Sequence, residues 1–132
     1  MTQKMVLLVE GDPDIRDIVQ DVLEADGYDV IPASHGRQAI EFLNAVRATT
    51  PPALVILDLK MQFSGGGSVL DAIRGDRALA SVPIVVMSAG PQEAPAGVAA
   101  LLRKPFSLAS LFDAVRSLAG AQDPQYATAR AN

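Results

Sequence analysis

Four polar residues of the sequence are of types that carry out phosphoryl chemistry when they lie together. Each closes a short apolar stretch: Glu10, Asp58, Ser88 and Lys104. Carboxylate oxygens are the ligands that Mg²⁺ prefers, alongside waters and phosphate oxygens. A carboxylate can also be the nucleophile that forms an aspartyl phosphate, while a hydroxyl and an ammonium neutralise phosphoryl oxygens. These residue types therefore predict a phosphoryl-transfer site, provided that the fold brings them together.

The apolar stretches that precede these residues have the pattern of buried strands. They cover residues 5–9, 28–32, 53–57, 84–87 and, more weakly, 99–103. Short continuous apolar runs are typical of strands that are covered on both faces, as in a parallel sheet. The sequence therefore predicts strands whose carboxyl ends carry the candidate site residues.

Amphipathic helices are expected between the strands. Asp12 is expected to cap the first helix, and Gly27 to end it. Ser34 is expected to cap a second helix and Ser107 the last one, while a short helix begins at Val69. Strands that alternate with helices, joined by right-handed crossovers, predict an α/β fold with a doubly wound parallel sheet. Ligands bind such sheets outside the carboxyl ends of the strands, so the candidate residues should share one rim.

Composition narrows the classes of function. The chain has 132 residues, which suits one domain, and a net charge of -4, which argues against a general nucleic-acid surface. With no Cys and one His, disulfides, thiolate sites and His-rich metal sites are excluded. The apolar runs are too short for a membrane span, and the N-terminus is too short and polar for a signal peptide. We therefore expect a cytoplasmic protein that binds neither nucleic acid nor membrane.

Four segments of the chain occur in the order expected for a known family. They read VLLVEGDPDIR, VILDLKM, IVVMSA and LLRKPF. Together they resemble the receiver domains of bacterial response regulators, over roughly residues 4–119. The resemblance implies a flavodoxin-like, five-stranded sheet with strand order 2-1-3-4-5. It also implies a receiver domain over residues 1–120, leaving residues 121–132 as a flexible C-terminal tail.

The resemblance also implies roles for the residues of the rim. Asp58 matches the phosphoacceptor, and Lys104, before an expected cis peptide bond to proline, matches the lysine that pairs with the phosphoryl oxygens. Ser88 matches the hydroxyl that reaches the phosphoryl group. Glu10 matches the first of two adjacent acidic residues that hold Mg²⁺, to which the backbone carbonyl of Lys60 and the carboxylate of Asp58 contribute.

Three departures from the family pattern bear on this site. Gly11 stands at the second acidic position and has no ligand atom, so we expect weakened Mg²⁺ binding. Leu101 stands where the family usually carries an aromatic ring. Only 16 positions separate Ser88 from Lys104, so the fourth helix should be short or absent.

Plainer interpretations remain open for each residue. Glu10 is either a metal ligand or an ion-pair partner of Lys104, and Lys104 either binds phosphate or simply pairs with Asp58. Asp58 itself is either a phosphoacceptor or an unreactive acidic residue of the rim. Ser88 is either a switch hydroxyl or a strand-end residue with a local hydrogen bond. Arg103 should face away from Lys104 by strand alternation and is given no role.

Two functions from different classes follow from the sequence. The first is a stand-alone response regulator receiver, which accepts a phosphoryl group on Asp58 from a sensor histidine kinase or phosphotransfer protein and contacts a downstream protein. Its catalysis would at most extend to its own phosphorylation and dephosphorylation. The alternative is a phosphorylation-independent pseudo-receiver that serves as an interaction module. A nucleotide- or flavin-binding domain is disfavoured, because no phosphate-binding glycine fingerprint is present.

Overall fold

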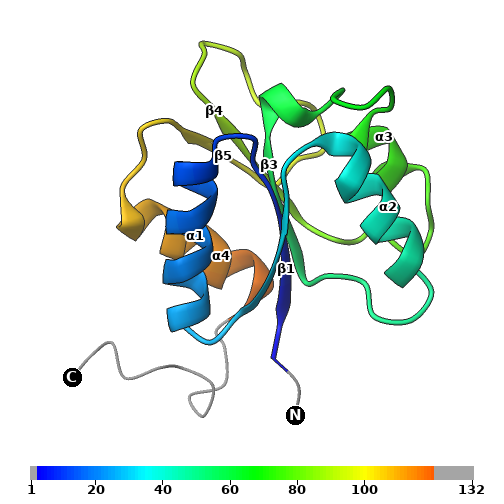
Figure 1. Ribbon diagram of the computed structural model, residues 1–132, viewed down its shortest axis with the longest axis horizontal. Coiled ribbons are helices and arrows are strands. Elements are labelled where there is room, and N and C mark those ends of the chain that lie inside the picture. The colour runs from blue at the N-terminus through cyan, green and yellow to red at the C-terminus, as the bar shows by residue number, and fades with distance from the viewer. Residues whose placement is uncertain (1–2, 121–132) are drawn as a thin grey trace.

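Five short parallel strands form one sheet in the order β2-β1-β3-β4-β5 (Figure 1). The structure is a computed structural model that describes residues 3–120. The strands are β1 Met5–Val9, β2 Asp29–Ala33, β3 Leu54–Asp58, β4 Ile84–Ser88 and β5 Ala100–Arg103. This order confirms the predicted doubly wound sheet. The order in which strands are added reverses between β1 and β3, because β2 lies on one side of β1 and the later strands lie on the other. The predicted C-terminal tail, residues 121–132, lies outside the described residues.

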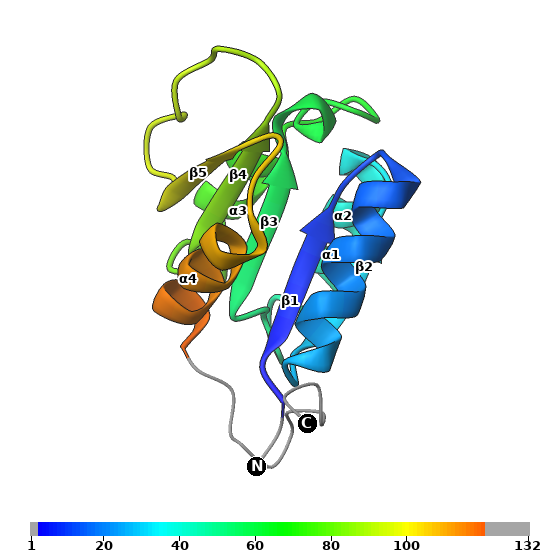
Figure 2. The same ribbon diagram turned by 90° about the vertical axis from the view of Figure 1, so that its left-hand side faces the viewer.

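Four α-helices cover the two faces of the sheet within the described residues. They are α1 Pro13–Ala25, α2 Gly36–Val46, α3 Val69–Arg74 and α4 Leu108–Ala119, with a 3₁₀ turn, η1, over Leu59–Met61. Helices α1 and α4 lie on one side of the sheet, and α2 and α3 on the other (Figures 1 and 2). No described helix is long and apolar enough to cross a membrane.

The connection from β4 to β5 contains no helix in the described structure. Residues 89–99 form turns and irregular backbone, which extends beyond the carboxyl ends of the strands (Figure 2). The short spacing between these strands predicted this result, because a crossover that includes a helix needs at least about 10–12 residues.

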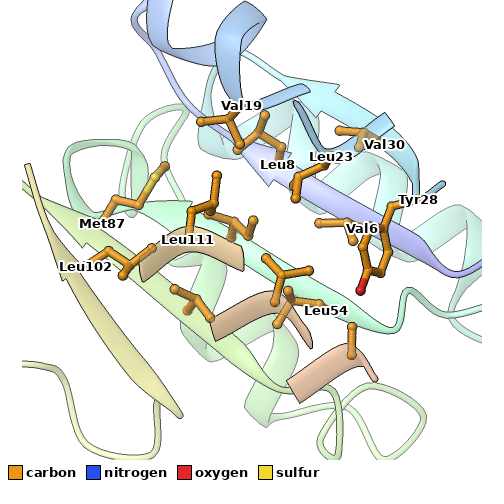
Figure 3. Packing of buried hydrophobic residues seen from close by; sticks show 14 residues of the cluster. Val6, Leu8, Val19, Leu23, Tyr28, Val30, Leu54, Met87, Leu102 and Leu111 are labelled. Atoms are coloured by element: carbon orange, nitrogen blue, oxygen red, sulfur yellow. The ribbon is translucent and has the colours of Figure 1, made fainter. Parts of the chain in front are cut away.

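Strand alternation divides the core into two clusters. We call the side of the sheet that packs against α1 and α4 the first face. Its cluster consists of strand residues such as Val6, Leu8, Leu54, Met87 and Leu102 together with Leu111 of α4, shown in Figure 3. The second face packs against α2 and α3, and its cluster consists of Leu7, Val9, Val55, Leu57 and Val86 together with Ile73 of α3. Both faces of every central strand are buried, because each side chain of a strand points opposite to the next. Each fully buried aliphatic side chain contributes about 1.5–3 kcal/mol.

The helix caps were mostly predicted. Asp12 accepts from the backbone N–H of Asp14 at 2.9 Å and caps α1, and Ser107 caps α4. The prediction of Ser34 as the second cap is wrong, because α2 begins one residue later. His35 has the extended backbone of a cap, and its Nδ1 accepts from the N–H of Gln38 at 3.2 Å.

A charged contact joins the two helices of the first face. The guanidinium of Arg116 on α4 donates to both carboxylate oxygens of Asp26, which follows α1, at distances from 3.0 to 3.2 Å. The same guanidinium lies 5.0 Å from the ring centroid of Phe112, within cation–π range. Asp26 is 8% exposed, so it is a packed residue of this interface.

Candidate functional site

A pocket of about 390 Å³ opens at the carboxyl ends of β1, β3 and β5. Its lining consists of Glu10, Gly11, Asp12, Ile15, Asp58, Lys60, Met61, Ala89 and Lys104. The pocket sits beside the point where the strand order reverses, which is where ligands bind open parallel sheets. The fold therefore brings three of the four predicted site residues, Glu10, Asp58 and Lys104, to one place.

Strand alternation explains why these three side chains meet. Each stands two residues after a side chain of the first face, namely Leu8, Ile56 or Leu102. Side chains two positions apart along a strand point the same way. Glu10, Asp58 and Lys104 therefore all extend from the first face, at the carboxyl ends of the strands.

The lysine ammonium bridges the two carboxylates. Lys104 Nζ lies 2.6 Å from Glu10 Oε1 and 3.5 Å from Asp58 Oδ2. The second oxygen of each carboxylate accepts a backbone N–H: Glu10 Oε2 from Asp12 at 3.1 Å, and Asp58 Oδ1 from Lys60 at 3.1 Å. Glu10 is 0% and Asp58 3% exposed. The ion pair between Glu10 and Lys104 is thus present, and the lysine is held closer to Glu10 than to the predicted phosphoacceptor.

Burial raises the pKa of the Glu10 carboxyl above its usual range. The Lys104 ammonium lowers this pKa, while the neighbouring Asp58 carboxylate raises it further. Removal from water disfavours the charged carboxylate, and a second carboxylate nearby adds repulsion. Two acids share one lysine, so the ionised pocket has an excess of negative charge and favours an added cation.

The hydroxyl of Ser88 is directed elsewhere. Ser88 is 3% exposed at the end of β4, yet its Oγ donates to Gln92 Oε1 at 2.9 Å and accepts from the Gly90 N–H at 3.2 Å. Two residues earlier, Val86 belongs to the second face, so alternation turns Ser88 away from the acidic pocket. The rim includes Ser88, as predicted, but its hydroxyl bonds locally.

Sequence reasoning missed the role of Arg103. Its guanidinium donates to the backbone carbonyl of Gly90 at 2.8 Å and to that of Gln92 at 3.0 Å. Arg103 is the register partner of Ser88 on the neighbouring strand. Strand alternation predicted that Arg103 faces away from Lys104, and the structure agrees. Arg103 therefore lies on the second face, on the same side of the sheet as Ser88. The sequence had no signal for the loop carbonyls that it binds.

The donor set fits a magnesium site with few protein ligands. Two buried carboxylates, Glu10 and Asp58, line the pocket with Lys60, and no group of three or more His, Cys, Asp and Glu among residues 3–120 is arranged so that all could hold one metal ion. Mg²⁺ is commonly bound by one or two carboxylates and several waters. Gly11 offers no side chain, and a Cβ there would lie 2.9 Å from the sulfur of Met61. Met61 thus occupies the space beside Gly11.

The sheet is doubly wound and flavodoxin-like, and a lysine and two buried acids meet at the carboxyl ends of its strands. These features place the protein among small α/β domains with an acidic pocket beside the point where the strand order reverses. Residues 6–116 match the family model described as the response regulator receiver domain. The chain belongs to this family. The cis peptide bond between Lys104 and Pro105, expected from the family resemblance, is present as well.

Curated relatives include both kinases and response regulators. The chain is 37% identical over 91 residues to the sensor histidine kinase TmoS of Ectopseudomonas mendocina, covering 69% of this chain and 9% of the kinase. It is 31% identical to the transcriptional regulator RpaA of Synechocystis, covering 86% of this chain and 48% of RpaA. The chain therefore spans less than half the length of these two relatives. It is 25% identical to the response regulator DivK of Brucella anthropi, covering 89% of this chain and 97% of DivK.

Solved structures share the fold. The receiver domain of the histidine kinase PA1611 of Pseudomonas aeruginosa superposes with a TM-score of 0.77 at 25% identity, covering 90% of this chain and 99% of that one. That domain has a magnesium ion coordinated in its active site cleft. The chemotaxis regulator CheY4 of Vibrio cholerae has a TM-score of 0.75 at 23% identity, covering 89% of this chain and 99% of that one, which shows the fold alone.

Proposed function

We propose that this protein accepts a phosphoryl group on Asp58 from a phosphohistidine of a sensor histidine kinase or phosphotransfer protein. It then signals through protein–protein contact. The observation that carries the proposal is the position of Lys104, whose ammonium lies between two buried carboxylates and within 3.5 Å of Asp58. A cytoplasmic location and a place in a phosphorelay are parts of the same proposal.

The proposed reaction is an exchange of one bond to phosphorus for another. An oxygen of the Asp58 carboxylate attacks phosphorus, the new O–P bond forms, and the N–P bond of the donor breaks. The histidine nitrogen leaves with the electron pair and afterwards takes up a proton. Because Asp58 is held in place by the N–H of Lys60 at 3.1 Å, its other oxygen, Oδ2, is the one that faces the pocket and the ammonium of Lys104.

Lys104 has the central part in this reaction. In the free protein its ammonium offsets the charge of Glu10 and Asp58. When a phosphoryl group reaches Asp58, its equatorial oxygens offer Lys104 a stronger, charge-assisted hydrogen bond. We expect Nζ to move from Glu10 toward the phosphoryl oxygens, which leaves the Glu10 carboxylate available to a cation.

Mg²⁺ is the proposed cofactor, held by Glu10, Asp58 and the backbone carbonyl of Lys60. When bound, it supplies positive charge that neutralises phosphoryl oxygens. The PA1611 receiver, which binds magnesium in its cleft, supports the choice of metal. We propose that binding is weak, because Gly11 contributes no carboxylate and Lys104 lies 2.6 Å from one Glu10 oxygen.

An apolar groove beside the pocket supports a protein as the phosphoryl donor. It has a volume of about 430 Å³ and shares Ile15, Ala89 and Lys104 with the acidic pocket. Its rim carries Ile18, 56% exposed, and Leu108, 47% exposed. A donor that covered this groove would bury apolar surface directly next to Asp58, which favours a protein over a small phosphorylated molecule.

The proposal is tested with a small acyl phosphate as donor and Mg²⁺ at millimolar concentration. Mass spectrometry should show the gain of one phosphoryl group in the wild-type protein and none in Asp58→Asn, which keeps the shape but cannot form the acyl phosphate. Asp71→Asn, an exposed acid on α3, is the matched control and should be modified like the wild type. Equal labelling of wild type and Asp58→Asn would refute the proposal.

A second candidate function is a pseudo-receiver, in which the same fold binds a partner without phosphate. Two observations favour it: the side chain of Met61 occupies the space beside Gly11, and Lys104 is held 2.6 Å from Glu10, closer than its 3.5 Å from Asp58. The same experiment separates the two functions. No labelling at millimolar Mg²⁺, together with partner binding that Asp58→Asn leaves intact, would establish the pseudo-receiver.

A further inference from the structure

An arginine of α1 contacts the turn that carries Glu10 into the acidic pocket. Arg16 is half-buried on the helix, and its Nη1 donates to the backbone carbonyl oxygen of Glu10 at 2.9 Å. The backbone N–H of Arg16 donates to the carbonyl oxygen of Asp12, also at 2.9 Å. Arg16 therefore contacts both ends of the turn between β1 and α1, residues 10–12.

The contact completes the hydrogen bonds of Glu10. Its backbone N–H donates to the carbonyl oxygen of Ala33 on β2 at 3.0 Å. Its carboxylate Oε2 accepts from the N–H of Asp12 at 3.1 Å, and Oε1 lies 2.6 Å from the ammonium of Lys104. The backbone carbonyl is the remaining acceptor, and Arg16 binds it. Both the side chain and the backbone of Glu10 are thus held in place.

The peptide bond between Glu10 and Gly11 is where such a contact has the most influence. Glycine has more backbone freedom than any other residue, so the turn can change shape at Gly11. The N–H of Asp12 follows this peptide bond and reaches Glu10 Oε2 only when the turn keeps its shape. Because Arg16 holds the carbonyl of the same peptide, it keeps the Asp12 N–H directed at the carboxylate.

We propose that Arg16 is a positioning residue, which fixes the Glu10 carboxylate for the proposed Mg²⁺ site by holding the turn at Gly11. This inference rests on the proposed function, in which Glu10 and Asp58 are the carboxylate ligands. Because Gly11 supplies no third carboxylate, a displaced Glu10 would leave Asp58 as the sole proposed carboxylate ligand. Groups that orient a metal ligand without touching the metal have a strong influence on metal affinity.

The sign of the effect on Mg²⁺ affinity separates this role from plain electrostatics. Arg16 carries a positive charge beside the turn, so a role of charge alone predicts that its removal strengthens Mg²⁺ binding. A positioning role predicts the opposite, because loss of the hydrogen bond releases a ligand residue. In calorimetric titration, Arg16→Met should bind Mg²⁺ roughly two- to tenfold more weakly than the wild type. Arg16→Lys keeps one charged donor and should recover part of the affinity.

Two other arginines provide matched controls. Arg37 stands in the first turn of α2 and pairs with the exposed Glu41, so Arg37→Met should bind Mg²⁺ like the wild type. Arg116→Ala weakens the contact between α4 and Asp26, and it shows that reduced stability alone leaves the affinity unchanged. In a Gly11→Ala background, Arg16→Met should have a smaller effect, because alanine restricts the backbone of the turn.

Amide hydrogen exchange, followed by NMR, tests the turn without metal or phosphoryl donor. In the metal-free protein, Arg16→Met should speed exchange of the Asp12 N–H roughly two- to tenfold, because its bond to Glu10 is weakened. Amides in the middle of α4 should exchange as in the wild type.

Unchanged exchange at Asp12 in Arg16→Met, or Mg²⁺ binding that is equal to or tighter than that of the wild type, overturns the inference. Either result leaves phosphoryl acceptance by Asp58 standing, provided that the wild type is labelled. Failure of the wild type to be labelled at Asp58 refutes the proposed function instead, while exchange at Asp12 still decides whether Arg16 holds the turn.

Discussion

The two faces of the sheet are covered to very different extents. The first face lies under two long helices, α1 with 13 residues and α4 with 12. The second face lies under α2 with 11 residues and α3 with only six, and the segment after β4 adds no helix. The acidic pocket extends from the first face, and the side chains of Ser88 and Arg103 from the second.

This difference also separates two groups of polar side chains at the carboxyl ends of the strands. Glu10 follows the buried strand β1 and Asp58 ends the buried strand β3, and both carboxylates pair with the ammonium of Lys104. Ser88 is held by hydrogen bonds to a segment that has no regular structure. A site for phosphoryl chemistry needs fixed geometry, whereas a signalling surface has to change between two states. Under the proposed function, the acidic pocket on the first face would need the fixed geometry, and the segment after β4 would be free to change.

The largest expected effect concerns the stability of the two faces. Leu111→Ala should lower the free energy of unfolding by about 2–5 kcal/mol, because Leu111 is 0% exposed on the side of α4 that faces the sheet, and its removal leaves a cavity. Leu101→Ala should cost much less, because Leu101 is half-buried at the margin of the second face. Urea denaturation measures both. Equal costs for the two variants would show that the faces contribute alike and would remove the contrast.

The next effect concerns the metal. Gly11→Asp should tighten Mg²⁺ binding by about tenfold, or ~1.4 kcal/mol, because it adds a carboxylate to a site that has two. The new Cβ would push on the flexible end of Met61, 2.9 Å away. Gly11→Ala introduces the same push without a ligand and is the matched control. Calorimetric titration should show tighter binding for the aspartate alone. If both variants bind Mg²⁺ like the wild type, the missing acid is not what limits the site.

A smaller effect concerns the charged contact that joins α1 to α4. Arg116→Ala should destabilise the protein by up to about 1 kcal/mol, since the Arg116 side chain is 46% exposed and water screens the pair. Arg116→Lys keeps the charge but loses the bidentate geometry and should recover only part of the loss. Arg47→Ala breaks an exposed ion pair with Asp76 next to the second face and should cost less. Thermal denaturation at low and high salt compares the three variants, and an Arg47→Ala loss above that of Arg116→Ala would contradict the prediction.

Most of the fold could be predicted from the sequence, because buried strands and capped helices leave local patterns. Asp58 was found because it directly follows an apolar run, and Lys104 because it ends the weaker strand pattern over residues 99–103; alternation then carried both to one face. The cap at His35 was missed because Ser34 is the commoner capping type and stands one residue earlier. The contacts of Ser88 with the Gln92 side chain, and of Arg103 with the carbonyls of Gly90 and Gln92, could not be predicted, because these acceptors belong to an irregular segment whose path leaves no periodic signal.

The smallest expected effect concerns the pKa of Glu10, and it shows whether burial or the ion pair with Lys104 has the larger influence on that pKa. The folded-state pKa of Glu10 is raised, chiefly by burial, so the protonated acid is the form that folding favours. Its contribution to stability is complete below the unfolded-state pKa, near 4.5, and is lost as the pH rises through the higher folded-state value. Glu10→Gln mimics the neutral acid at every pH. Measured in the presence of a metal chelator, the unfolding free energy of the wild type should therefore decline relative to Glu10→Gln as the pH rises above about 4.5. A rise in the unfolding free energy of the wild type over the same pH range would mean that attraction to Lys104 outweighs desolvation of Glu10. The ion pair would then stabilise the folded protein despite the burial of the carboxylate.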